Sequence, residues 1–212
     1  MIGRGGPARA AVLLGTVAPL LLAACSDSTS IAGGESSVLG QVVVATGPAG
    51  YRVAVDHALS VEDVATATSS EPRGLARTLQ RTGFDGGWSR VWTSGDAYLN
   101  IVVVAAGTAF GAQELQQFQA QQLSGGSGVV AYPDADVPGA RAFDFYGLTR
   151  QGGRQVFCQG VLFSIEALVF TLNDCNSAPR AADRVLAVAR AQYVRAAGQL
   201  GVSVASGAPS PS

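Results

Sequence analysis

The spacing of apolar residues changes along the chain, and its clearest feature is a β-hairpin. Trp88, Arg90 and Trp92 recur with a period of two, which places them on one face of a strand. A turn at residues 94–96 and a β-branched run over residues 97–106 follow. This pattern predicts two antiparallel strands, of which the second is largely buried.

Helical spacing appears on both sides of this hairpin. Ser60 precedes a short helix with acidic residues in its first turn, and a second helical stretch covers residues 75–81. Thr108 is expected to cap a glutamine-rich helix that ends at about residue 123. A last helix is expected to begin at Ser177 and to end near Gly198.

Strand spacing returns in the second half of the chain. Residues 140–148 place Phe143 and Phe145 on one face of a strand, and residues 154–173 predict a strand pair. The Gly- and Pro-rich stretch 124–139 predicts a loop with turns. This order of elements predicts an α+β domain in which helices pack on an antiparallel β-sheet.

The N-terminus resembles a bacterial lipoprotein signal. Arg4 and Arg9 precede an apolar run over residues 10–24, which is short for a membrane-spanning helix. The run ends in Leu22-Ala23-Ala24-Cys25, a lipobox whose cysteine receives a diacylglyceryl group before cleavage on its amino side. We therefore expect a protein on the extracytoplasmic face of the cell membrane, anchored by acyl chains such as palmitate. An uncleaved membrane helix is the alternative.

These features divide the chain into four parts. Residues 1–24 are the expected signal peptide, and residues 25–37 are a flexible tether rich in Gly and Ser. Residues 38–200 form the single domain, in which residues 51–55 are expected to be an edge strand. Residues 201–212 are expected to be a disordered tail.

The two cysteines of the domain, Cys158 and Cys175, are expected to form a disulfide. An even pair of cysteines in an exported chain is normally bridged. Direct opposition of the two cysteines on neighbouring strands would centre the intervening turn between Glu166 and Ala167. A redox-active pair is the alternative, although such pairs normally have the shorter Cys-x-x-Cys spacing.

Composition excludes several classes of function. The chain from Cys25 onward has 12 arginines against 15 acidic residues and no basic cluster, so nucleic-acid binding is not expected. Lysine is absent, which excludes a Schiff-base lysine and the lysine of a phosphate-binding loop. His57 is the only histidine, and no Gly-x-Ser-x-Gly motif or set of metal ligands accompanies it. We therefore expect a non-enzymatic protein without metal or cofactor.

Several small and aromatic positions resemble those of known lipoproteins. The pattern Gly83-Phe84-x-x-Gly87-x-x-Arg90-x-Trp92, then a valine-rich strand, then Gly107-Thr108-Ala109-Phe110-Gly111-Ala112 resembles lipoproteins of mycobacteria and related actinobacteria. Over about residues 60–197 the order of elements is similar to that of the LpqN-type group, which has the Mog1/PsbP-like fold. The resemblance implies a non-enzymatic envelope protein that acts in binding or assembly, an argument by analogy.

Two sets of residues are candidate binding sites. Trp88, Arg90 and Trp92 form a recognition surface if their face of the strand is exposed. If a helix covers that face, the tryptophans are core residues and Arg90 reaches the edge. A candidate apolar pocket between sheet and helix is lined by Phe143, Phe145, Phe157 and Phe163.

Two functions fit this sequence. We expect a lipid-anchored envelope protein that binds another envelope protein through an exposed sheet face or through the glutamine-rich helix 108–123. The alternative is a carrier or sensor of an apolar envelope molecule, such as a lipid or glycolipid, in the phenylalanine-lined pocket. A packed core with an exposed aromatic patch favours the first function, and an apolar cavity favours the second.

Overall fold

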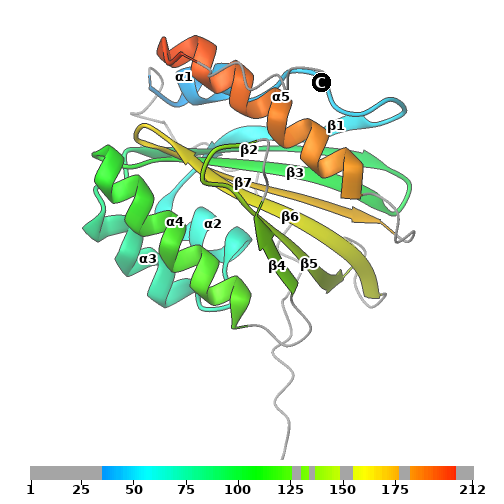
Figure 1. Cartoon of the computed structure of the whole chain (residues 1–212), viewed down its shortest axis with the longest axis horizontal. Helices are drawn as coiled ribbons and strands as arrows, with labels where there is room; N and C mark the ends of the chain where they lie inside the picture. The colour runs from blue at the N-terminus through cyan, green and yellow to red at the C-terminus, as the bar shows by residue number, and fades with distance from the viewer. Residues whose placement is uncertain (1–34, 126–129, 134–136, 149–154, 177–181, 204–212) are drawn as a thin grey trace, which may run out of the picture.

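The computed structural model describes residues 35–125, 130–133, 137–148, 155–176 and 182–203. Within these ranges, seven strands form one antiparallel sheet in the order β1-β2-β3-β7-β6-β5-β4 (Figure 1). The strands are β1 (Arg52–Leu59), β2 (Gly86–Ser94), β3 (Ala97–Ala105), β4 (Val130–Pro133), β5 (Arg141–Leu148), β6 (Gln155–Ile165) and β7 (Leu168–Asn176). The predicted α+β class and antiparallel sheet are confirmed.

Helices cover both faces of this sheet (Figure 1). We call the side covered by α1 and α5 the α5 face, and the side covered by α2, α3 and α4 the α4 face. The helices are α1 (Glu35–Val42), α2 (Val61–Thr68), α3 (Pro72–Arg81), α4 (Ala109–Ser124) and α5 (Ala182–Leu200).

The central strand β3 shows how the sequence divides the core between the two faces. Ile101 and Val103 pack in the cluster beneath α1 and α5, whereas Val102 and Val104 pack in the cluster beneath the other three helices. All four side chains are buried. The continuous β-branched run is therefore explained by a strand with an apolar layer on each side.

The predicted helix starts are confirmed by their caps. Ser60 Oγ accepts a hydrogen bond from the Asp63 amide at 3.2 Å, and the Ser60 amide donates to the Asp63 carboxylate at 3.0 Å. Thr108 Oγ1 accepts from the Gly111 amide at 3.0 Å at the start of α4. Both side chains satisfy backbone amides that have no partner within their own helix.

The predicted position of the β6–β7 turn is also confirmed. Cys158 and Cys175 are directly opposed partners, and the ladder continues to Ile165 opposite Leu168. The two residues between them, Glu166 and Ala167, make the turn, and Glu166 has a φ of +50°.

Three local expectations differ from the structure. Residues 35–37, which were assigned to the tether, belong to helix α1. The stretch predicted to contain only loop and turns includes the short edge strand β4. Gly198 does not end the last helix, which continues to Leu200 before Gly201 at a φ of +68°. The expected cap at Ser177 lies outside the described residues.

Candidate functional site

One row of residues across the α5 face changes from apolar to polar. Neighbouring strands pair Trp92 with Leu99, Leu99 with Asp174, Asp174 with Gln159, and Gln159 with Asp144. The first two side chains belong to the apolar core, and the last three carry carboxylate or amide groups. Together with the ion pair of Arg90 and Asp56, these polar side chains interrupt a mostly apolar face, and the row is our first candidate site.

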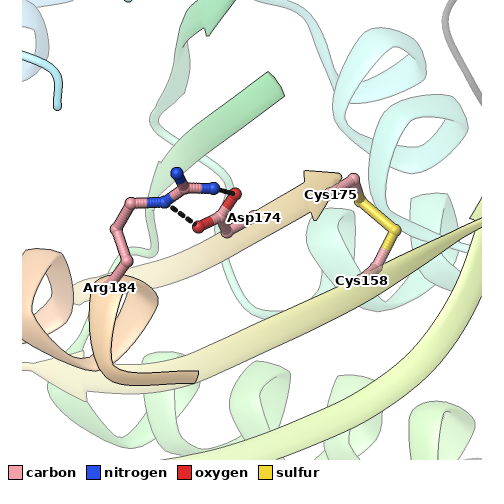
Figure 2. The surroundings of a disulfide bond; sticks show 4 residues. All are labelled: Cys158, Asp174, Cys175 and Arg184. Carbon is pink, nitrogen blue, oxygen red and sulfur yellow. Dashed lines mark hydrogen bonds and ion pairs between the residues drawn. A yellow bond between two sulfur atoms is a disulfide. The ribbon is translucent and has the colours of Figure 1, made fainter. Parts of the chain in front are cut away.

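A buried ion pair lies at the centre of this polar row. Arg184 of α5 donates two hydrogen bonds to the Asp174 carboxylate, from Nε at 2.5 Å and from Nη2 at 2.6 Å (Figure 2). The Asp174 side chain is fully buried, whereas 33% of the Arg184 side chain is exposed. The hydrogen bond to Asp174 raises the pKa of Arg184, so its guanidinium stays charged. The pair joins the first turn of α5 to β7.

Tyr51 extends the ion pair toward the start of β1. The Arg184 guanidinium carbon lies 5.1 Å from the centre of the Tyr51 ring, within cation–π range. Burial raises the pKa of Tyr51, and the nearby Arg184 charge acts in the opposite direction. Tyr51, Arg184 and Asp174 therefore connect three elements that are distant in the sequence.

The rest of the row contains polar atoms that are closed off from solvent. Gln159 is only 3% exposed, and its Nε2 donates to Asp144 Oδ1 at 2.9 Å. Gln159 Oε1 and Trp92 Nε1 are buried and have no hydrogen-bond partner among the described residues. Asp144 is only half-buried and a third of the Arg184 side chain is exposed, but the ion pair and the buried amide support a structural role for the row, the docking of α5 on the sheet.

The disulfide lies next to this row but on the opposite face of the sheet. Cys158 and Cys175 are joined between β6 and β7, and Asp174 is the residue directly before Cys175 (Figure 2). Tyr98 and Phe145 pack around the two cysteines on the α4 face. The disulfide predicted from the sequence is confirmed.

The candidate recognition residues of the hairpin lie beneath α1. Trp92 is 1% exposed, and the Trp88 indole donates from Nε1 to Asp56 Oδ1 at 2.7 Å. A β-carbon at Gly40 of α1 would lie 2.9 Å from the Trp88 ring, so the helix rests directly on it. The Arg90 side chain is 11% exposed. The face is covered, so these residues belong to the core and do not form an exposed recognition surface.

The four phenylalanines of the expected apolar pocket do not line one cavity. Phe143 and Phe145 point to the α4 face, whereas Phe163 packs in the core beneath α5. Phe157 packs edge-on against Tyr146, 5.8 Å between ring centres, and Tyr146 has the opposite orientation from Phe145 in β5. The sheet separates the two pairs, so the single pocket expected from the sequence is wrong.

The glutamine-rich helix α4 has an inner side that packs against the domain and an outer side that is exposed to solvent. On its inner side, Gln116 Oε1 accepts from Ser164 of β6 at 2.6 Å, and Gln119 donates to Thr68 of α2 at 3.4 Å. These amides attach the helix to its neighbours. They are not available for an external partner.

The outer side of α4 is exposed and carries one charged residue, Glu114, which is paired with Arg81 of α3. Gln113, Gln117 and Gln121 recur with helical spacing on this side and are all exposed. Phe110, in the first turn, is 76% exposed. We call these four residues the α4 outer surface. The helical spacing of the glutamines predicts a polar side of the helix. Only the structure shows which glutamines are exposed and which bind the rest of the domain.

The described helices include none that is long and apolar enough to cross a membrane. Cys25, the expected lipidation site, lies outside the described residues. Within the described ranges, His, Cys, Asp and Glu side chains nowhere gather in a group of three that could hold a metal ion. His57 is exposed on the edge strand β1, away from the polar row.

Comparison with known proteins identifies a similar fold. No protein-family model and no curated protein matches the sequence. The structure is similar to the crystal structure of the extracellular domain of PknH from Mycobacterium tuberculosis, with a TM-score of 0.52 and 13% sequence identity. The alignment covers 76% of this chain and 96% of that domain. At this identity the similarity shows a shared fold, and the resemblance to the LpqN-type group stays a prediction.

Proposed function

We propose that this chain is a lipid-anchored protein of the cell envelope that acts without catalysis by binding another envelope protein. Cys25 would carry the lipid, and the α4 outer surface would contact the partner. Two observations support an extracytoplasmic location. The Cys158–Cys175 disulfide is typical of oxidising compartments, and the domain with the similar fold is extracellular.

The observation that carries the proposal is the composition of the α4 outer surface. Protein interfaces are depleted of charge at their centres and enriched in aromatic residues. Phe110 is the most exposed large apolar residue among those described, and Gln113 and Gln117 follow it on the same side of the helix. Most of the Phe110 side chain is in contact with water in this domain, and a partner would remove it from water.

The positions of the phenylalanines make the carrier of an apolar molecule the weaker proposal. Phe143 and Phe163 are both fully buried and belong to different cores. Neither contributes a free apolar wall. Native mass spectrometry of the chain purified from its envelope tests the carrier directly, because a bound lipid at one per chain would favour it over protein binding.

Site-specific photo-crosslinking in the intact envelope tests the partner surface. A benzophenone amino acid at Gln117 should give a discrete crosslinked product, and the same probe at Glu62, exposed on α2, should not. Phe110→Ala should abolish the product while leaving the unfolding midpoint unchanged, because the side chain is mostly exposed. Equal crosslinking from both positions, or a product insensitive to Phe110→Ala, would contradict the proposal.

The anchor has its own test. Cys25→Ser should release the protein from the membrane fraction, and intact-mass measurement of the unaltered protein should show acyl chains on Cys25. A Cys25→Ser protein that remains in the membrane fraction would contradict lipid anchoring and favour an uncleaved membrane helix.

A further inference from the structure

The short distance in sequence between Cys25 and α1 limits how far the domain can stand from its anchor. Nine residues separate Cys25 from Glu35, where α1 begins. At full extension, the ten Cα–Cα steps from Cys25 to Glu35 span about 35 Å. If Cys25 is lipidated, the start of α1 must therefore lie within about 35 Å of the lipid surface.

Helix α1 is fixed to the domain and cannot swing away from it. Arg90 donates to the carbonyl oxygens of Gly40, Val43 and Val44, at 3.3, 3.2 and 2.8 Å. Gln192 of α5 is buried and donates to the Val42 carbonyl at 2.8 Å. These bonds satisfy carbonyls that a helix end leaves without partners.

A third contact ties α1 to α5. Arg195 Nε donates to the Gln41 carbonyl at 2.9 Å. Helix α1 therefore moves with the domain, and the segment from Cys25 joins the domain on the α5 face.

Helices α1 and α5 expose several large apolar side chains. The described residues include six exposed large hydrophobic side chains, and three of them lie on these two neighbouring helices. They are Val38, 56% exposed, Val194, 56% exposed, and Leu200, 40% exposed. We call this the α1/α5 surface. Figure 1 shows the two helices side by side over the same face of the sheet.

The charge of α5 suits an anionic lipid surface. Helix α5 contains three arginines and one acidic residue, Asp183, and Arg184 is paired with Asp174 of the sheet. Of the other two arginines, Arg190 is exposed and Arg195 is half-buried. A helix with exposed apolar residues and a net basic charge is typical of attachment to a membrane surface. On the opposite face, the three arginines of α3 are balanced by the three acidic residues of α2 and α4.

We propose that the α1/α5 surface lies on the lipid surface to which Cys25 tethers the chain, with Val38, Val194 and Leu200 at the lipid boundary. The proposal rests on the anchoring part of the proposed function. It places α2, α3 and α4 on the side of the domain that faces away from the membrane.

Depth-dependent fluorescence quenching tests this orientation. The chain from Cys25 onward is coupled to a maleimide lipid through Cys25, which is the free thiol because Cys158 and Cys175 are bridged. The vesicles contain phosphatidylcholine, phosphatidylglycerol and a brominated lipid. Val194→Trp should be quenched at least threefold more than the matched control Gln117→Trp, after subtraction of the signal of the unaltered chain. Equal quenching, or stronger quenching at position 117, would overturn the proposal.

Added acidic charge gives a second test. In the Val194→Trp chain, Val38→Glu with Leu200→Glu should reduce quenching by at least half. Gln113→Glu with Gln121→Glu, which adds the same charge on α4, should leave it unchanged. No effect of the first pair would overturn the proposal. Because the coupling is chemical, a failure of natural lipidation at Cys25 in cells would be seen separately, as the absence of acyl mass.

Discussion

The ion pair between Asp174 and Arg184 gives a sharp test of the packing on the α5 face. The Asp174 side chain is fully buried, whereas a third of the Arg184 side chain is exposed. Removal of Arg184 leaves a buried carboxylate without its partner. Removal of Asp174 leaves a guanidinium that can turn toward water. The two substitutions should therefore have unequal effects on the free energy of unfolding.

The expected magnitudes follow from this asymmetry. Arg184→Ala should lower the free energy of unfolding by about 3 kcal/mol, the low end for a broken buried pair, because water reaches the emptied position. Asp174→Ala should lower it by about 2 kcal/mol, the net value of hydrogen bonds between charged groups. The double variant should also lose about 2 kcal/mol, because it leaves no unpaired charge. Adding Asp174→Ala to Arg184→Ala should therefore restore about 1 kcal/mol.

Urea unfolding measures these differences. Tryptophan fluorescence follows the transition with the disulfide intact, and equal slopes confirm that the variants are compared on the same transition. The exposed pair of Arg81 and Glu114, with side chains 62% and 36% exposed, is the matched control. Glu114→Ala should change stability by less than about 1 kcal/mol. A double variant that loses the sum of the two single losses would refute the coupling of Asp174 with Arg184.

Four smaller predictions follow from single positions. Gly47→Ala would place a β-carbon 2.4 Å from Trp92 Cδ1 and should lower the free energy of unfolding by about 1–3 kcal/mol in urea. Gly198→Ala, on the exposed side of α5 with no atom within 4 Å, should raise it by about 1 kcal/mol. Ser60→Ala removes the capping box of α2 and should lower it by about 1 kcal/mol. Burial raises the pKa of Tyr51 above 10.0, so Tyr51 loses its proton at a lower pH in the unfolded chain than in the folded protein. The contribution of Tyr51 to the free energy of unfolding is therefore fully present below pH 10.0 and is lost as the pH rises through the raised pKa. Tyr51→Phe should remove this part of the alkaline loss in unfolding curves recorded across that pH range, and an unchanged loss would contradict the assignment.

Local patterns in the sequence were sufficient for the elements that depend on neighbouring residues. Ser60 and Thr108 are helix caps that act within three residues. The β6–β7 turn was predictable because one long-range assumption, direct opposition of Cys158 and Cys175, sets the register of the whole hairpin. The sequence therefore predicted the class of the fold and two of the six strand pairings of the described residues, β2 with β3 and β6 with β7.

The predictions were wrong where the structure depends on contacts between residues that are distant in the sequence. Helix α1 is only eight residues long, too short to be stable alone, and it is held by Arg90 and Gln192, which are 47 or more residues away in sequence. The phenylalanine pocket failed for a related reason. A period of two shows that Phe143 and Phe145 share a face, but only the register between strands shows that Phe163 lies on the other.

The two proposed surfaces lie on opposite sides of one sheet, and this arrangement makes their roles separable. A helix is about 10 Å across, and helix layers flank the sheet on both faces, so the α4 outer surface stands about 30 Å from the α1/α5 surface. A partner bound at Phe110 would therefore meet the domain without contacting lipid. Val38→Glu with Leu200→Glu should reduce lipid quenching and leave crosslinking from Gln117 intact. Phe110→Ala should do the reverse, and a variant on one side that abolishes both signals would show that the two surfaces are not independent.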